Sequence, residues 1–127
     1  MYDKERRIEP DLVIQDGDKF YIFDVKYKNF NLQNGVNRND LFQLHTYIGQ
    51  YSNYKKVCGC GFIYPISEEK YNRINSTLIS STITQNNNMI PFHIVFLKIP
   101  NENNKFLEEM NLSCDNFIEI FKEKIII

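Results

Sequence analysis

Two short apolar runs on either side of a tight turn constrain the fold of this chain most strongly. The runs 12–14 (LVI) and 20–27 (FYIFDVKY) flank residues 15–18, whose sequence QDGD is rich in turn-forming residues. An Asp-Gly pair between two strand-like runs predicts a β-hairpin that closes near Gly17. Residues about a dozen positions apart in the sequence then become neighbours across the hairpin.

Charged side chains lie along this predicted hairpin. Strict alternation in the second run places Asp24 and Lys26 on the same face as Ile22. Asp11 opens the first run, and the hairpin brings its carboxylate toward that of Asp24. Two carboxylates and an ammonium group are therefore expected to converge. For an isolated D-x-K triplet the alternative is an exposed pair of charges on a strand, so the interpretation depends on the rest of the sequence.

A helix is predicted over residues 39–51, with Asn39 as its cap. Its apolar stripe recurs at intervals of three and four residues and consists of Leu41, Leu44, Ile48 and Tyr51. Gln43 and Tyr47 are one turn apart and lie beside this stripe. We expect them to reach the edge of the acidic site.

Paired carboxylates beside a lysine suit the hydrolysis of a phosphodiester. Mg²⁺ is commonly held through one or two carboxylates, together with water and substrate phosphate. The metal polarises a phosphoryl oxygen and makes its bound water a better nucleophile. In such a site Lys26 would stabilise developing charge or position that water.

The order of the motifs resembles a known nuclease superfamily. Pro10-Asp11, Asp24-Val25-Lys26 and Gln43-x-x-x-Tyr47 follow the pattern of the PD-(D/E)xK nucleases, in the RecB-like branch that has an additional Q-x-x-x-Y helix motif. The segments PDLVIQDGDKFYIFDVKYK, NDLFQLHTYIGQY and CGFIYP look more closely like the McrC-type nuclease subunit of modified-cytosine restriction systems. The resemblance covers residues 8–65.

This resemblance implies an α/β domain of the restriction-endonuclease-like kind, with a mixed central β-sheet flanked by helices. Family members usually have a helix, often with a glutamate, and a further strand before the Pro-Asp motif. Nine residues precede Pro10 here, so we expect that first helix and strand to be lacking or supplied by another chain. We interpret residues 1–127 as a single nuclease-like domain, either a fragment or a reduced variant.

The same resemblance implies roles for particular residues. The implied catalytic set is Asp11, Asp24, Lys26, Gln43 and Tyr47. Asp11, Asp24 and the Val25 carbonyl would hold Mg²⁺, for which Mn²⁺ can substitute. Lys26 would stabilise charge, while Gln43 and Tyr47 would orient substrate phosphate or the lysine. A partner NTPase that recognises modified DNA and licenses cleavage is also implied.

The expected function is therefore that of a Mg²⁺-dependent DNA endonuclease of the McrC type. A RecB-like repair or recombination exonuclease is one alternative, because the same five residues serve both activities. A catalytically silent DNA-binding or assembly subunit with the same fold is a second alternative.

The charge distribution bears on DNA binding. The net charge is −1, but residues 1–65 contain nine Lys or Arg against eight acids, and residues 66–127 contain six against eight. We predict a phosphate-contacting patch in the first half, made of Lys28, Arg38, Lys55 and Lys56. Ordinary solvated surface is the alternative.

The composition places the chain among globular proteins, with 43% hydrophobic and 24% charged residues. No apolar run is long enough to span a bilayer and no charged-then-apolar leader opens the sequence, so a cytoplasmic location without membrane contact is expected. Cys58, Cys60 and Cys114 lack the spacing of a zinc ribbon or an iron–sulfur site and are interpreted as reduced core residues. His45 and His93 are given no catalytic role.

The remaining elements are predicted from local pattern. A buried strand over residues 57–64 ends at Pro65, and the strand–helix–strand order implies a crossover. We predict helices over residues 68–83 and 111–124, a strand over 91–99, and loops over 85–88 and 101–104. Leu112, Phe117, Ile120 and Phe121 are the apolar residues of the last predicted helix.

Overall fold

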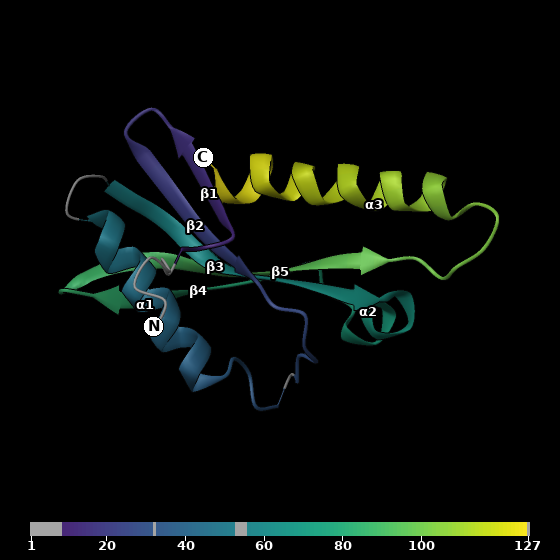
Figure 1. Cartoon of the computed structure of the whole chain (residues 1–127), viewed down its shortest axis with the longest axis horizontal. Helices are drawn as coiled ribbons and strands as arrows, with labels where there is room; N and C mark the ends of the chain where they lie inside the picture. The colour runs from purple at the N-terminus through teal and green to yellow at the C-terminus, as the bar shows by residue number, and fades with distance from the viewer. Residues whose placement is uncertain (1–8, 32, 53–55, 127) are drawn as a thin grey trace, which may run out of the picture.

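The computed structural model describes residues 9–31, 33–52 and 56–126, and they form one five-stranded mixed β-sheet with helices on both faces (Figure 1). The strand order is β1-β2-β3-β5-β4. In chain order the elements are β1 (Leu12–Asp16), β2 (Lys19–Val25), α1 (Arg38–Ser52), β3 (Lys56–Ser67), α2 (Glu68–Ile74), β4 (Leu78–Gln85), β5 (Asn88–Ile99), α3 (Phe106–Ile120) and the π-helical turn η1 (Phe121–Ile125). The predicted fold class is confirmed, because this architecture is consistent with a restriction-endonuclease-like α/β fold.

The predicted hairpin is present as β1 and β2. The two strands pair antiparallel, with Leu12 opposite Phe23 and Asp16 opposite Lys19. Gly17 adopts a φ of +65°, a left-handed conformation that glycine reaches without steric cost. The turn therefore fixes the register of the pair, and the register decides which side chains lie opposite one another.

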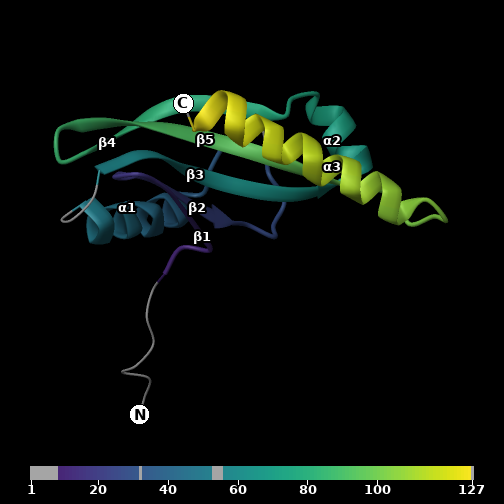
Figure 2. The ribbon, with the colours of Figure 1, turned by 90° about the horizontal axis from the view of Figure 1, so that it is seen from above.

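The sheet separates two hydrophobic clusters. Ile22 packs with Leu44 and Tyr47 on the side covered by α1. Tyr21 and Phe23 pack on the opposite side, against α3 and η1. Figure 2 shows α1 and α3 on opposite sides of the sheet. The alternation predicted for β2 is thus confirmed, and it places the residues that follow Ile22 at even positions on the α1 side.

The strand β3 runs parallel to both β2 and β5 and does not end at Pro65 as predicted. Its last paired residue on the β2 side is Ile63, which lies opposite Val25 at the end of β2. Beyond that point β3 has only β5 as a neighbour, where Pro65 lies opposite Leu97. A proline is tolerated there because no strand on the β2 side requires an N–H donor from it.

The predicted helix over residues 68–83 is wrong in its second half. The helix α2 ends at Ile74, and Asn75 has a φ of 53° that terminates it. The Ser- and Thr-rich segment that follows is the edge strand β4, paired antiparallel with β5. Asn86 and Asn87 both have positive φ, as a two-residue hairpin turn requires, so the predicted loop at 85–88 is the turn of this hairpin.

The last helix begins earlier than predicted, at Phe106, and one of its apolar residues lies outside its buried face. Ser113, Phe117 and Phe121 follow one another at intervals of four and lie toward the sheet, either buried or half-buried. Leu112 is adjacent to Ser113 and therefore turned about 100° away from that face. Its side chain is 61% exposed, so Leu112 is an apolar residue of the helix that does not belong to the buried face.

Within the described ranges, no helix has the length and apolarity needed to cross a membrane.

The three cysteines differ in burial. Cys60 is buried in the α1-side cluster, and burial raises the pKa of its thiol to about 12. Cys58 and Cys114 are only half-buried, so the expectation of three core cysteines holds fully for Cys60 alone.

Candidate active site

The carboxylates of Asp11 and Asp24 meet where β1 begins and β2 ends. The backbone N–H of Asp11 donates to Asp24 Oδ1 at 3.1 Å, and the backbone N–H of Val25 donates to Asp11 Oδ2 at 2.9 Å. Both bonds follow from the hairpin register, because continuing the Leu12–Phe23 pair by one residue sets Asp11 opposite Asp24. The predicted convergence of the two acids is therefore present in the structure.

Lys26 lies beside Asp24 and is held by three side-chain oxygens. Its Nζ is 2.9 Å from Asp24 Oδ2 and 3.4 Å from Asp40 Oδ1, and it donates to Gln43 Oε1 at 3.0 Å. The Lys26 side chain is only 11% exposed. Burial by itself would lower its pKa, but the two carboxylates outweigh burial and raise the pKa of Lys26 above its usual value. Lys26 therefore stays protonated, and its ammonium group is held in place by these three oxygens.

The pKa of Asp24 is raised above its usual value. Burial is the largest cause, since it disfavours the charged form. The hydrogen bond from Lys26 opposes this effect, whereas the neighbouring Asp11 carboxyl adds to it. Asp24 is thus a carboxylate that gains from any additional positive charge placed next to it.

The first turns of α1 bring three further side chains to this point. Asn37, not the predicted Asn39, caps the helix, because Asn37 Oδ1 accepts from the backbone N–H of Asn39 at 2.8 Å. From that start, Gln43 faces Lys26, as its hydrogen bond shows. Tyr47 is buried one turn further along, and its pKa is raised by burial and, to a smaller extent, by Asp24. The predicted Q-x-x-x-Y helix thus faces the two acids and the lysine.

Asp40 is a site residue that the sequence interpretation missed. Its side chain is 9% exposed and contacts Lys26, and Lys28 Nζ lies 3.0 Å from its Oδ2. Asp40, Gln43 and Tyr47 follow one another at intervals of three and four residues. This spacing places all three on one face of the helix and could have revealed Asp40.

Comparison with known protein families places this site in context. A family model described as "McrBC 5-methylcytosine restriction system component" matches residues 2–65. This match spans half of the chain and includes all five of the predicted catalytic residues. The chain belongs to the McrBC family. A search of curated proteins gave no match.

The four lysine and arginine residues predicted to contact DNA lie in different parts of this McrBC-family chain. Lys28 lies at the site and pairs with Asp40, and the exposed Arg38 opens α1 two residues before Asp40. Lys56 lies opposite Lys19, at the other end of β2 from Asp24. Lys55 lies outside the described residues. The structure therefore brings Lys28 to the site but not Lys56.

The possible metal donors are few. Among the described residues, no group of three or more His, Cys, Asp and Glu side chains could hold a metal ion. Of the predicted donors, the Asp11 and Asp24 carboxylates lie together, and Val25 is the residue whose backbone N–H donates to Asp11. His93 is buried within β5 beside Ser80 Oγ, and His45 contacts the side chain of Gln85.

Proposed function

We propose that this McrBC-family chain is the DNA-cutting subunit of its restriction system, a Mg²⁺-dependent endonuclease of the McrC type within the PD-(D/E)xK superfamily. One observation supports this most strongly: Asp11, Asp24 and Lys26 converge at the end of one hairpin, with Lys26 Nζ 2.9 Å from Asp24. Two acids and a cation at one point match the needs of phosphodiester hydrolysis.

The donor set fits a hard divalent cation. It consists of oxygens only, from Asp11, Asp24 and the Val25 carbonyl, and Mg²⁺ takes one or two carboxylates together with water and substrate phosphate. The raised pKa of Asp24 supports the same assignment, because a cation at the two carboxylates would offset the cost of keeping them ionised in a buried position. When bound, Mg²⁺ would polarise the phosphoryl oxygen and lower the pKa of a coordinated water.

The remaining side chains act on the substrate and on one another. Lys26 would donate a hydrogen bond to a phosphoryl oxygen and stabilise the charge that develops there. Asp40 and Gln43 hold its ammonium group from the α1 side, so Lys26 enters the reaction already oriented. Tyr47 closes the site toward the core, where its ring packs with Leu44 and Ile48.

A restriction subunit of this kind would work with a partner NTPase that selects modified DNA. Family membership supports the assignment to such a system, because the matching family model is described as a component of a 5-methylcytosine restriction system. A RecB-like exonuclease would use the same five residues, so these residues do not distinguish the two modes of cutting. The form of the DNA substrate distinguishes them. An endonuclease cuts closed circular DNA, whereas an exonuclease requires an end.

One observation favours a second candidate, a silent DNA-binding or assembly subunit. Among the described residues, no group of three or more His, Cys, Asp and Glu side chains is placed to hold a metal ion, and the third carboxylate at the site, that of Asp40, pairs with Lys26 and Lys28 instead. Lys26 is also already paired with Asp24 and Asp40. A chain that had lost its chemistry could keep this arrangement as a structural ion-pair network.

Incubation with DNA in Mg²⁺ or Mn²⁺ tests the proposal. We expect wild type, alone or with a candidate NTPase partner, to cut DNA, and we expect Asp24→Ala and Lys26→Ala to lose this activity while staying folded. Closed circular and linear substrates in parallel distinguish the endonuclease from the exonuclease. If wild type cuts no better than the two variants in any of these conditions, the silent-subunit function replaces the proposed one.

A further inference from the structure

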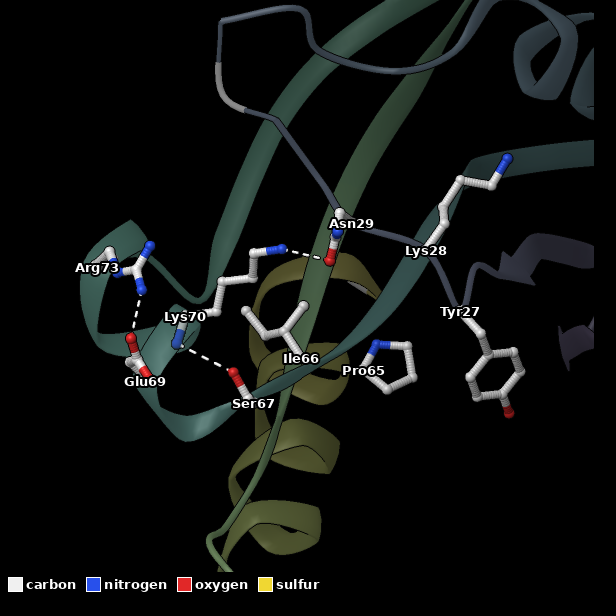
Figure 3. A pocket seen from close by; sticks show the side chains of 9 residues that line it. All are labelled: Tyr27, Lys28, Asn29, Pro65, Ile66, Ser67, Glu69, Lys70 and Arg73. Carbon is white, nitrogen blue, oxygen red and sulfur yellow. Dashed lines mark hydrogen bonds and ion pairs between the residues drawn. The ribbon is translucent and has the colours of Figure 1, made fainter.

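A cleft of about 410 Å³ opens beside the candidate site, between the segment that follows β2 and the helix α2 (Figure 3). Its floor is formed by the end of β3, and its walls come from residues on both flanking segments. The lining includes Lys28, Asn29, Pro65, Ile66, Lys70 and Arg73. None of these except Lys28 belongs to the site described above.

The cleft adjoins the site through Lys28. Lys28 lines the cleft, and its Nζ binds Asp40, which in turn contacts Lys26. Both features lie on the same face of the sheet, because Tyr71 and Ile74 of α2 pack against the cluster that α1 covers. A second hollow of about 480 Å³, also lined by Asn29, Lys70 and Arg73, extends the cleft along α2.

The charges that line the cleft favour an anion. Three cations, Lys28, Lys70 and Arg73, line the cleft together with one carboxylate, that of Glu69, and Lys28 is paired with Asp40. Lys70 Nζ donates to the neutral amide oxygen of Asn29, so this contact leaves its charge available. Arg73 pairs with Glu69 on the same helix, but both side chains are more than 70% exposed, and such surface pairs contribute little. A phosphate can therefore compete for Arg73.

An aromatic ring stands at the opposite end of the cleft from Arg73. In Figure 3, Pro65 and Ile66 lie between Tyr27 and Arg73. Tyr27 is 85% exposed, which is unusual for a large aromatic side chain. Exposed aromatic rings beside basic grooves stack on nucleic-acid bases, and any base can be accepted because all have a π-face.

We propose that this cleft binds the DNA strand on one side of the scissile phosphate, with Lys70 and Arg73 contacting consecutive phosphates and Tyr27 stacking on a base. This assignment rests on the proposed nuclease function, because that function places the reacting phosphate at Lys26 and makes Lys28 the first cation beyond it. The position of the cleft beside the candidate site, with Lys28 lining the one and pairing with Asp40 of the other, favours a polynucleotide over an acidic peptide, which would not require a hydrolytic site at one end.

DNA binding in the absence of divalent metal tests this proposal separately from cutting. The probes are a fluorescein-labelled single strand and the matching duplex, followed by anisotropy over a range of salt concentrations. The variant is Lys70→Gln with Arg73→Gln, which removes two charges and keeps the alkyl stems. The matched control is Lys105→Gln with Lys122→Gln, which removes two exposed cations from the ends of the α3–η1 segment.

We expect the cleft variant to bind about tenfold more weakly than wild type, with a salt dependence shallower by about 1.4 to 1.8, because each of the two lost phosphate contacts contributes about 0.7 to 0.9 to that slope. The control should change the slope by less than half as much. Tyr27→Ala should weaken single-strand binding several-fold, whereas Tyr27→Phe should retain it.

Equal losses in the cleft variant and its control would overturn the proposal, and so would tighter binding of a polyglutamate peptide than of DNA. The cutting assay separates the two claims. If wild type cuts DNA and the cleft variant binds DNA as tightly as wild type, the proposed role of the cleft is rejected and the nuclease function is kept. If DNA binding depends on the cleft but wild type does not cut, the role of the cleft in DNA binding is supported and the nuclease function is rejected.

Discussion

Asp11 and Asp24 are tied to each other through the backbone of opposite strands. Asp24 accepts from the N–H of Asp11, and Asp11 accepts from the N–H of Val25, the residue after Asp24. The two carboxylates are therefore positioned by the register of the β1–β2 hairpin and not by side-chain packing alone. A shift of one residue would separate them and turn one strand's side chains to the other face.

Replacing Asp24 by asparagine should remove metal binding without weakening the fold. Asparagine keeps an oxygen that can accept from Asp11 N–H but carries no charge, and the raised pKa of Asp24 means that its charged form is disfavoured in the folded state. In electron paramagnetic resonance, wild type should bind Mn²⁺ and so reduce the signal of free Mn²⁺. Asp24→Asn should leave that signal unchanged. The melting temperature of Asp24→Asn should be no lower than that of wild type. A strongly destabilised Asp24→Asn would contradict this account of the carboxylate.

The raised pKa of Asp24 also predicts a pH dependence of stability. At pH values between the usual aspartate pKa and the raised one, the folded chain binds more protons at Asp24 than the unfolded chain does. The contribution of Asp24 to the free energy of unfolding must therefore fall as pH rises through that interval. Urea titrations of wild type and Asp24→Asn at several acidic pH values measure it, and the difference between the two should change with pH in this direction. A pH-independent difference would mean that the Asp24 pKa is not raised.

The same ionisation should shape the activity. Metal binding needs Asp24 ionised, so the acid limb of the cutting rate should lie above the usual range for an aspartate. Rates measured from acidic to neutral pH at Mg²⁺ concentrations well below saturation give this limb, because saturating metal would itself favour the ionised form of Asp24. An acid limb at the ordinary aspartate value would show that burial does not control the ionisation of the metal-binding form.

The core of the candidate site could be predicted from the sequence because it depends on local periodicity. Alternation along β2 places Asp24 and Lys26 on one face, and helical spacing places Gln43 and Tyr47 together. Asp40 belongs to neither sequence motif, and only its helical spacing from Gln43 and Tyr47 could have indicated it, since an acid in the first turn of a helix is commonly solvated. Its burial arises from tertiary structure, through Lys26 and Lys28 on a separate segment.

The second half of the fold was less predictable for a related reason. The segment 78–85 contains Ser and Thr beside Leu and Ile, a composition that permits either a helix or a strand. Its strand conformation depends on β5, with Ile79 opposite Ile94 and Ile83 opposite Ile90. The Asn86–Asn87 turn was the available local signal, because two residues that tolerate positive φ can close a hairpin.

Asp40 should act as a positioning residue for Lys26. Asp40→Asn removes one of the two carboxylates that raise the pKa of Lys26. We expect about a tenfold lower cutting rate, the size of effect typical of supporting groups around a metal site. The alkaline limb of the rate should also move to lower pH, because Lys26 then loses its proton sooner. The control Asp115→Asn changes an exposed acid of α3 and should alter neither quantity. An unchanged alkaline limb in Asp40→Asn would show that Asp40 does not act through Lys26.

Gly61 should be essential to the sheet. A Cβ at this position would lie 1.8 Å from the backbone oxygen of His93, its neighbour across the β3–β5 pair, so the strands would have to separate. We expect Gly61→Ala to destabilise the fold by about 3 kcal/mol. Gly49→Ala is the matched control, because its Cβ would meet only Gln85 Nε2 at 3.5 Å and alanine favours the helix by about 1 kcal/mol. Urea midpoints measure both, and equal stability of the two variants would contradict the close approach.

The central claim is that this chain hydrolyses DNA at the paired carboxylates of Asp11 and Asp24, where β1 begins and β2 ends. The most direct measurement is the initial rate at which closed circular DNA containing 5-methylcytosine is opened in Mg²⁺, with a candidate NTPase partner present, by wild type and by Asp24→Asn. We predict metal-dependent opening by wild type and a loss of at least about a hundredfold in Asp24→Asn. Equal rates for the two proteins, with and without metal, would contradict the account.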